Sequence, residues 1–218
     1  MTRLYSFFNS STSFRVRIAL ALKGLDYDCI PVNIRTGGHR EADYVATVNP
    51  AAAVPVLSID EGPHQLTLGQ SLAIIDYLDT TFPDPRLIPS EAVLRARVME
   101  LSHLIACDIH PVNNLRVLRY LQDRLGVSAV QKNEWYKHWI AEGLSVAERL
   151  LVRSGGSRYC FGDSPTLADC CLIPQVANAS RMGCDIEIYP TVNTIYRYAM
   201  TQPAFAAAAP ERQPDHTP

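Results

Sequence analysis

Four consecutive hydroxyl side chains, Ser10-Ser11-Thr12-Ser13, stand between two segments with regular apolar patterns. Residues 4–8 are apolar and aromatic, which is typical of a short strand, and residues 14–23 have the apolar spacing of a helix. The first N–H groups of a helix have no acceptor within it, and the positive end of the helix dipole lies beside them. The hydroxyl run is therefore predicted to favour an anion, and a thiolate is one such anion.

This loop contains no Cys-x-x-Cys pair, the dithiol of thioredoxin-type redox enzymes, so it can stabilise only a thiolate that a ligand brings. A free thiol with a pKa of about 8.5 is only about 3% ionised at pH 7, and a pKa lower by about 2 would make the thiolate the majority species. The same hydroxyls also suit the simpler role of capping the helix, and spacing alone leaves both roles open.

Two further loops offer groups that complement a peptide-like ligand. Residues 49–55 read NPAAAVP, and a cis Pro55 would turn the backbone N–H and C=O of Val54 outward. Gln70-Ser71 begins another apolar helical segment, whose N-terminus can bind a carboxylate. A thiolate site, a backbone clamp and a carboxylate site together match glutathione, which carries all three groups.

These loops need a frame of alternating strands and helices. A strand is predicted over 27–32, a short helix over 40–48, a hairpin of 56–59 with 65–68 around Asp60-Glu61-Gly62-Pro63, and a helix from Ser71. Gly24 is predicted to end the first helix. The order βαβαββα is that of a thioredoxin-like domain, so the expected fold is an α/β N-terminal domain followed by an all-α domain.

The remaining chain reads as helical. Prolines within 82–89 predict a stiff linker, which gives expected domains over 1–82 and 91–218 joined by 83–90. Helices are predicted over 91–125 with a kink near Pro111, over 128–152, and after Thr166, with Asp169 buried as its capping partner. The alanine- and proline-rich segment 203–218 is expected to lie on the surface or fray.

Composition excludes several classes of protein. Of 218 residues, 47% are hydrophobic and 19% are charged, which is typical of a folded globular protein. Lys and Arg total 20 against 22 Asp and Glu, so no basic excess indicates nucleic acid, and a small-molecule partner is expected. No apolar run approaches the roughly 18–20 residues of a membrane-spanning helix, and no signal peptide is evident, so a cytoplasmic protein with no membrane partner is expected.

The cysteines predict no metal site. They are Cys29, Cys107, Cys160, Cys170, Cys171 and Cys184. None form a Cys-x-x-Cys pair, and the adjacent Cys170 and Cys171 lie in an apolar segment. Buried, reduced thiols are therefore expected.

Longer motifs identify a family. Residues 10–20 read SSTSFRVRIAL and residues 70–78 read QSLAIIDYL. These resemble SSCSxRVRIAL and QSLAIIEYL of the zeta class of glutathione transferases, the class that includes maleylacetoacetate isomerase. The stretches 108–116, 174–179 and 212–215 follow the class pattern as well. The first motif is specific to the class, whereas the general fold pattern is shared by all transferases of this type.

The resemblance implies a homodimer that binds glutathione as a cofactor in its N-terminal domain and a small acidic diketo acid against its helical domain. The implied activity is glutathione-dependent cis–trans isomerisation of maleylacetoacetate to fumarylacetoacetate. The thiolate would add to the activated cis double bond, rotation would follow about the resulting single bond, and elimination would give the trans product.

The resemblance also assigns roles by motif position. Ser10 and Ser11 are expected to hold the glutathione sulfur, and Arg181 the substrate carboxylate, so these three are the expected catalytic residues. The expected glutathione-binding residues are Ser10, Ser11, Thr12, Ser13 and Arg15, then Val54, Pro55, Gln70 and Ser71, and from the helical domain His110, Asn114 and Arg116. Without the resemblance, His110 reads as a kink residue and Arg181 as an ordinary helix-end arginine.

The sequence departs from the class pattern in three places. Thr12 replaces a cysteine, Asn9 stands where an arginine often precedes the serines, and Ala51-Ala52-Ala53 replace longer polar side chains. None of these changes removes the predicted thiolate site, but the first two bear on substrate identity and rate.

Three alternatives remain open at this point. The same chemistry on a shorter diketo acid would make the protein a maleylpyruvate isomerase, although Leu115, where an arginine could clamp that substrate, favours maleylacetoacetate. Conjugation or dehalogenation of small α-halo acids would use the same thiolate site. A non-catalytic binding protein with this fold is the third, and the joint presence of the three loops argues against it.

Overall fold

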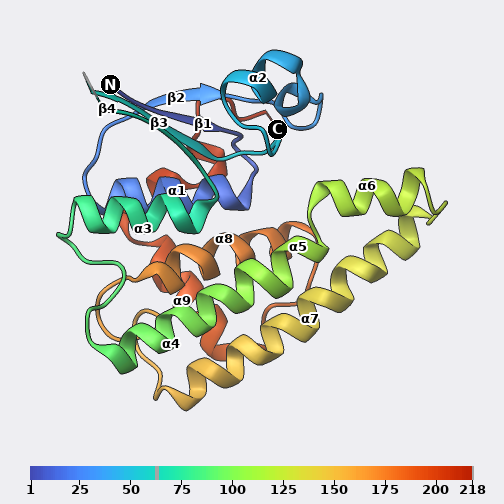
Figure 1. Cartoon of the computed structure of the whole chain (residues 1–218). Coiled ribbons are helices and arrows are strands. Elements are labelled where there is room, and N and C mark those ends of the chain that lie inside the picture. The colour runs from blue at the N-terminus through green and yellow to red at the C-terminus, as the bar shows by residue number, and fades with distance from the viewer. Residues whose placement is uncertain (62–63, 218) are drawn as a thin grey trace. The chain divides into compact units, whose positions relative to one another are not determined.

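A computed structural model describes residues 1–61 and 64–217 of the chain (Figure 1). The chain divides into two compact units, which are described separately. Unit 1 comprises Met1–Leu87 with Met200–Pro218, and unit 2 comprises Ile88–Ala199. By these contacts the segment from Met200 lies with unit 1, whereas the boundaries expected from the sequence group it with the helical domain.

Unit 1 is built on a four-stranded mixed sheet with the strand order β2-β1-β3-β4. The strands are β1 Thr2–Ser6, β2 Asp28–Pro31, β3 Val56–Glu61 and β4 His64–Gly69. β1 pairs in parallel with β2 and antiparallel with β3. β3 pairs antiparallel with β4, which confirms the predicted hairpin. Gly62 and Pro63 of the predicted turn lie outside the described residues.

The first three helices of unit 1 match the predicted order, whereas α10 is not among the predicted elements. They are α1 Ser11–Leu22, α2 Ala42–Thr47, α3 Ser71–Thr81 and α10 Pro203–Ala208, with short 3₁₀ turns at Gly38–Arg40 and Pro210–Arg212. α1 and α3 run along the same face of the sheet (Figure 1). Gly24 follows α1 with φ of 63°, which confirms its predicted role as the helix stop. The element order is therefore that of the thioredoxin-like domain.

The expectation that the C-terminal segment lies on the surface or frays is wrong. Phe205 and Ala208 are buried, and α10 packs against α1. The buried Arg17 of α1 donates hydrogen bonds to Ser6 Oγ (3.1 Å) and to the carbonyl oxygens of Phe7 (3.3 Å), Phe8 (2.9 Å) and Ala208 (2.9 Å). Asp215 Oδ2 accepts from the Phe8 N–H at 2.9 Å. The alanine-rich composition of the C-terminal segment gives no sign of these contacts, because Ala208 and Asp215 meet partners some 200 positions earlier in the chain.

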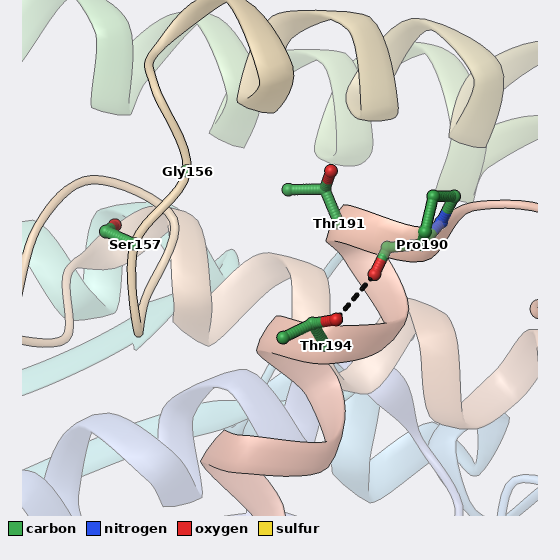
Figure 2. A pocket seen from close by; sticks show the side chains of 5 residues that line it. All are labelled: Gly156, Ser157, Pro190, Thr191 and Thr194. Carbon is green, nitrogen blue, oxygen red and sulfur yellow. Dashed lines mark hydrogen bonds between the residues drawn. The ribbon is translucent and has the colours of Figure 1, made fainter.

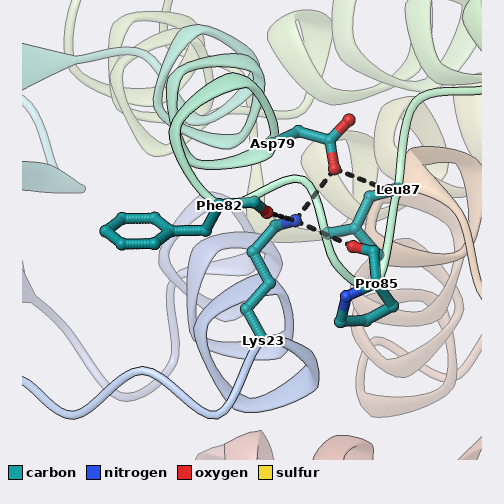
Figure 3. Close-up of polar contacts among 5 residues, drawn as sticks. All are labelled: Lys23, Asp79, Phe82, Pro85 and Leu87. Carbon is teal, nitrogen blue, oxygen red and sulfur yellow. Dashed lines mark hydrogen bonds and ion pairs between the residues drawn. The ribbon is translucent and has the colours of Figure 1, made fainter.

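The linker region is held by a buried cation (Figure 3). Lys23 Nζ donates to Asp79 Oδ1 (2.9 Å), Phe82 O (2.6 Å) and Pro85 O (2.8 Å). The same Asp79 oxygen accepts from the Leu87 N–H at 2.6 Å. The Lys23 and Asp79 side chains are 0% and 4% exposed. This network fixes the start of the predicted linker more firmly than proline stiffness alone would.

Unit 2 consists of helices, as predicted. They are α4 Ala92–His103, a π-helical segment Leu104–Ile109, α5 His110–Val112, α6 Leu115–Asp123, α7 Ala129–Arg153, α8 Leu167–Arg181 and α9 Pro190–Met200. Asp169 is buried and accepts from the N–H groups of Cys160 and Thr166, both at 2.8 Å, which confirms its structural role. α9 is not among the predicted elements.

The predicted kink takes the form of the π-helical segment. The His110 N–H donates to Ile105 O, five residues back, just before Pro111. Gly143 of α7 lies against this segment, because a Cβ at Gly143 would be 2.2 Å from Ile109 Cγ1. The close approach of α7 therefore requires a residue without a side chain.

Candidate functional site

The hydroxyl run forms the start of α1, with Ser10 as the N-cap residue. Ser10 Oγ accepts from the Ser13 N–H at 3.2 Å and lies 2.9 Å from Thr12 Oγ1. Thr12 Oγ1 in turn donates to Val54 O at 3.1 Å. Because Thr12 has a single hydroxyl hydrogen, Ser10 must be the donor in the Ser10–Thr12 pair. The predicted capping role is thus present, and the cap is connected to the second loop.

That second loop contains a cis peptide bond between Val54 and Pro55, as predicted. Two side chains outside the predicted site support it by donating to Ala53 O, namely Asn49 Nδ2 at 2.9 Å and Tyr44 Oη at 2.7 Å. Burial raises the pKa of Tyr44, so its hydroxyl stays protonated and remains a donor. The Asn49-Pro50 turn signal could have identified Asn49, but nothing local identifies Tyr44.

The third loop meets α1 through a buried arginine. Gln70 precedes α3 with φ of 65°, a conformation that L-residues other than glycine rarely adopt. Ser71 begins the helix, and its Oγ accepts from Arg15 Nη1 at 3.4 Å. Arg15 is 2% exposed, and its Nε and Nη2 atoms have no hydrogen-bond partner among the described residues. Arg15 is therefore a buried cation that contacts the start of α3.

α1 thus connects all three predicted loops. Thr12 contacts the loop before Pro55, and Arg15 contacts the start of α3. Ser13 is buried, and its Oγ has no partner among the described residues. N–H groups at the first turns of two helices, hydroxyls and a guanidinium form this cluster, so it presents donors rather than acceptors. Such a cluster can bind an anionic ligand.

Unit 2 brings together three other predicted residues at the break between α5 and α6. Asn114 is the N-cap of α6, and its Oδ1 accepts from the Arg116 N–H at 3.1 Å. Asn114 Nδ2 lies 3.4 Å from His110 Nε2. The Arg116 residue is exposed. The break therefore brings the His110 imidazole and the Asn114 amide together, with the exposed Arg116 two positions beyond.

Two residues that were not predicted as site residues hold this break against α7. Asn113 Nδ2 donates to Tyr136 O at 3.1 Å, and Trp135 Nε1 donates to Val112 O at 3.0 Å. Sequence motifs could not identify these contacts, because they join positions 23 residues apart across two helices.

Arg181 lies at the C-terminal end of α8, where its Nη2 donates to Asn178 Oδ1 at 2.7 Å. Burial raises the pKa of Tyr136 to about 12, and the positive charge of Arg181 acts in the opposite direction. Arg181 is thus an exposed cation close enough to Tyr136 to influence it. This position suits a group that meets a negatively charged substrate.

A separate hollow of about 290 Å³ in unit 2 is lined by Gly156, Ser157, Pro190, Thr191 and Thr194 (Figure 2). Thr194 Oγ1 donates to Pro190 O at 2.7 Å. The N–H groups of Thr191 and Val192 already donate to the Glu148 carboxylate, at 3.0 and 2.9 Å. The start of α9 is therefore occupied by an internal anion, and no predicted site residue lines this hollow.

Within residues 1–61 and 64–217, no group of three or more His, Cys, Asp or Glu residues could hold a metal ion. No helix in the described part of the chain is long and apolar enough to cross a membrane. All six cysteines are free, and Cys160, Cys170 and Cys171 are buried as expected. Cys107 is exposed, so the expectation of burial does not hold for it.

Comparison with known proteins agrees with this geometry. The model of the glutathione S-transferase N-terminal domain family matches residues 9–81. A probable maleylacetoacetate isomerase of Vibrio cholerae is 47% identical over 97% of this chain and 97% of its own. The chain belongs to the zeta class of glutathione transferases, the maleylacetoacetate isomerase family.

Solved structures of zeta-class relatives have the same fold. A holo structure of a bacterial zeta-class maleylpyruvate isomerase has a TM-score of 0.93 and 41% identity, covering 99% of this chain and 100% of that one. A maleylacetoacetate isomerase from Anaeromyxobacter dehalogenans, solved with glutathione in its active site, has a TM-score of 0.89 and 40% identity, covering 99% and 97%. The glutathione transferase fold of this chain is thereby confirmed.

Proposed function

We propose that this zeta-class transferase is a glutathione-dependent cis–trans isomerase that converts maleylacetoacetate to fumarylacetoacetate. The observation that carries the proposal is the connection of three loops by α1, through Thr12 to Val54 and through Arg15 to Ser71. The named relatives support it, since they include maleylacetoacetate isomerases over nearly the full chain.

The residues present fit glutathione. Its thiolate would lie at the first turn of α1, its peptide backbone along Val54-Pro55, and a carboxylate at Gln70-Ser71. The Arg15 nitrogen atoms without partners indicate that this cluster carries more donor capacity than the described protein groups use. When glutathione is bound, the chemistry it supplies is reversible addition of its thiolate to the activated cis double bond of the substrate.

The residues of the chain would bind and orient the two anions of this chemistry, the glutathione thiolate and the substrate carboxylate. Ser11, with the N–H groups of the first turn, would donate to the sulfur and lower the thiol pKa, and Ser10 would join them by turning its hydroxyl hydrogen from Thr12 to the sulfur. Thr12, Ser13 and Pro55 shape the same region. His110, Asn114 and Arg116 would contact the tripeptide. Arg181 would bind the substrate carboxylate and offset negative charge that develops on the adjacent oxygen.

Maleylpyruvate is a second candidate substrate, because the zeta-class neighbour with a TM-score of 0.93 is a maleylpyruvate isomerase. Both diketo acids carry a carboxylate and an activated cis double bond. We further propose that the protein works as a cytoplasmic homodimer. Six free cysteines fit a reducing compartment.

The test is an isomerase assay with both acids, with and without glutathione, on the wild type, Ser10→Ala and Ser11→Ala. Loss of a positioned donor to the sulfur is expected to lower kcat by about 10²-fold. Ser10→Asp is the matched control, because it still accepts from the Ser13 N–H as a cap but offers no donor to the sulfur. It is therefore expected to fold like the wild type and to remain slow.

Absence of turnover with either acid, despite glutathione binding, would exclude isomerisation and favour conjugation or dehalogenation of α-halo acids. Absence of glutathione binding would favour the non-catalytic binding protein. The ratio of kcat/KM for the two diketo acids identifies the preferred substrate.

A further inference from the structure

We infer that Asp215 is a positioning residue for the sulfur subsite, because its carboxylate holds the turn of residues 7–10 from which α1 begins. The inference rests on the proposed function, in which the first turn of α1 receives the glutathione thiolate. The C-terminal segment thereby takes part in the reaction, although none of its residues is expected to contact glutathione or the diketo acid.

The turn of residues 7–10 determines where α1 begins. The Ser10 N–H donates to Phe7 O at 3.0 Å, and Ser10 O accepts from the Phe14 N–H at 2.9 Å. The backbone of Ser10 therefore belongs both to the turn and to the first turn of the helix. A displacement of the turn would move the hydroxyls and N–H groups that are proposed to meet the sulfur.

Residues far away in the chain hold the backbone of this turn. Arg17 donates to Phe7 O (3.3 Å) and to Phe8 O (2.9 Å). The Phe8 N–H donates to Asp215 Oδ2 at 2.9 Å. Phe8 is 4% exposed, and a buried backbone N–H that lacks an acceptor is costly. Asp215 supplies that acceptor from a position 207 residues later.

Asp215 belongs to a part of the C-terminal segment that is itself held in place. Gln213 Nε2 donates to Ala209 O at 2.9 Å, and the His216 N–H donates to Gln213 O at 3.0 Å. The His216 ring lies edge-on to the Phe8 ring, with the centroids 5.2 Å apart. Two consecutive residues of the segment thus contact Phe8, one at its backbone N–H and the other at its ring.

Arg17 and Asp215 place opposite charges beside the turn. Burial lowers the pKa of Arg17 to about 10, and the negative charge of Asp215 acts in the opposite direction. Arg17 therefore remains a cation at neutral pH and keeps its donors. The turn is held between a cation that donates to two of its carbonyl groups and an anion that accepts from one of its N–H groups.

Asp169 provides an internal contrast, because it is a carboxylate with a structural role in unit 2. Its Oδ1 accepts from the Cys160 N–H and its Oδ2 from the Thr166 N–H, so both oxygens are used. Asp215 Oδ2 accepts from the turn before α1, whereas its buried Oδ1 has no partner among the described residues. One acceptor oxygen aimed at the turn is therefore what this position requires, and an asparagine also provides one.

The experiment measures the pKa of the thiol of bound glutathione, through the ultraviolet absorbance of its thiolate, in the wild type, Asp215→Ala and Asp215→Asn. Asp215→Ala leaves the Phe8 N–H without its acceptor, so the turn shifts and the thiol pKa is expected to rise by about 1. Asp215→Asn keeps an acceptor oxygen and is expected to retain the wild-type thiol pKa. A role through charge alone would instead lower the thiol pKa in both variants, because both lack the carboxylate charge.

The pH dependence of turnover gives a second readout. A raised thiol pKa reduces the thiolate fraction only where the thiol is protonated. With saturating glutathione, kcat/KM of Asp215→Ala for the diketo acid is therefore expected to be about tenfold below that of the wild type at a pH below both thiol pKa values, and close to it above both. A variant that only loses folded protein would be slower by the same factor at every pH.

Two further variants separate positioning from folding. Gln213→Leu is the matched control, because it removes side-chain hydrogen bonds within the same segment and keeps Asp215. It is expected to lower the thermal unfolding midpoint while leaving the thiol pKa at the wild-type value. Asp215→Glu keeps the acceptor and the charge on a longer side chain, so an intermediate thiol pKa is expected. This variant tests the inference even if Asp215→Ala does not fold.

The outcomes are distinguishable. A wild-type thiol pKa in a folded Asp215→Ala, or in Asp215→Glu where the alanine variant does not fold, would overturn the inference and leave the proposed isomerase function intact. A rise in Asp215→Asn or Gln213→Leu as large as that in Asp215→Ala would overturn it as well. If the wild type binds glutathione without lowering its thiol pKa and turns over neither diketo acid, the proposed function fails and the inference fails with it.

Discussion

The two units of the molecule differ in where their charged side chains lie. Unit 1 buries the side chains of Arg15, Arg17, Lys23 and Asp79, and all four contact segments far away in the sequence. In unit 2, every residue of which the structure describes, Asp169 is the only buried charged residue. The ion pairs of unit 2 lie at the surface, with side chains 41% to 83% exposed.

The difference corresponds to what each unit must position. In the proposed function, unit 1 has to hold three loops whose backbone groups would face glutathione, and buried donors fix such loops at defined distances. Unit 2 presents side chains from a helix break, which is shaped by apolar packing and caps such as Asn114. Such a difference is expected if unit 1 recognises the cofactor, which stays the same, and unit 2 recognises the substrate, which can vary.

The largest expected effect is in the buried network of unit 1. Lys23→Met leaves Asp79 without its cation and two carbonyl groups without a donor, so we expect a loss of about 3–5 kcal/mol in the free energy of unfolding. Arg197→Met is the matched control, because it removes the exposed pair with Glu187 in unit 2 and is expected to cost about 1 kcal/mol or less. Urea denaturation of both variants measures the contrast.

Combining Lys23→Met with Asp79→Leu refines this prediction. Replacing both members of a buried pair by apolar residues is less harmful than removing one, so part of the lost stability is expected to return. Equal losses in Lys23→Met and Arg197→Met would show that the buried ion pair of unit 1 contributes no more to stability than an exposed pair of unit 2.

The next effect concerns the packing that shapes unit 2. Alanine favours a helix by about 1 kcal/mol over glycine, yet a Cβ at Gly143 would be 2.2 Å from Ile109 Cγ1. The clash is expected to dominate, so that Gly143→Ala lowers the free energy of unfolding by about 1–3 kcal/mol. Thermal unfolding followed by circular dichroism measures the change.

A double-mutant cycle with Ile109→Ala tests the cause. Ile109→Ala removes the side-chain atoms that the new Cβ would meet, so the double variant is expected to be less destabilised than the sum of the two single variants. Strict additivity would exclude the contact with Ile109 as the reason why residue 143 is a glycine.

Patterns within a few residues were sufficient to predict most of the fold. The strands of unit 1, α3 and the stop at Gly24 follow from alternation, periodicity and glycine chemistry. α9 was not predicted although it carries local signals, with Pro190 at its start and the buried Val192, Ile195 and Ala199 at helical spacing. Its cap, Glu148 of α7, lies more than 40 positions earlier and could not have been predicted locally. The kink near Pro111 was predicted from the proline, but the close contact of Ile109 with Gly143 of α7 was not, because it joins two helices that only the folded chain brings together.

The candidate site likewise combines residues that local patterns predict with residues that only the folded chain brings together. Residue types at helix starts predicted Ser10 and Ser71, since capping and anion binding are local properties. Asn49, Tyr44 and Trp135 were not predicted as contributors, because each acts by a hydrogen bond to a backbone carbonyl that only the folded chain brings near. The burial of Arg15 and its pairing with Ser71 are tertiary facts of the same kind.

The two units also differ, to a smaller extent, in the backbone strain that they contain. Within the described residues, the two non-glycine residues with positive φ are Ala52 at 49° and Gln70 at 65°. Both lie in loops of unit 1 that the proposed function assigns to glutathione. Gln70→Gly is expected to relieve the strain and match or exceed wild-type stability by up to about 1 kcal/mol, while glutathione affinity falls. Gln70→Ala is the matched variant that loses the side chain but keeps the strain, so the same loss of affinity without a gain in stability is expected. Calorimetric titration and thermal unfolding separate the two effects, and higher glutathione affinity in Gln70→Gly would contradict a functional reason for the strain.

The smallest effect is expected at a surface charge of unit 2, where Glu91 caps α4 by accepting from the N–H groups of Val93 at 2.8 Å and Leu94 at 2.6 Å. These hydrogen bonds lower the pKa of the Glu91 carboxyl. Because the pKa is lower in the folded state than in the unfolded state, the stabilisation is complete above the unfolded value, about 4.3, and is lost as the pH falls through the folded value. Glu91→Gln should therefore unfold at a slightly lower temperature than the wild type at pH 7, and the two midpoints should converge toward pH 3. High salt should reduce the difference at pH 7, since Glu91 is fully exposed to solvent. A difference in unfolding midpoint that is the same at both pH values would mean that the charge of Glu91 contributes nothing to the cap. The side chain would then act only through the geometry of its hydrogen bonds.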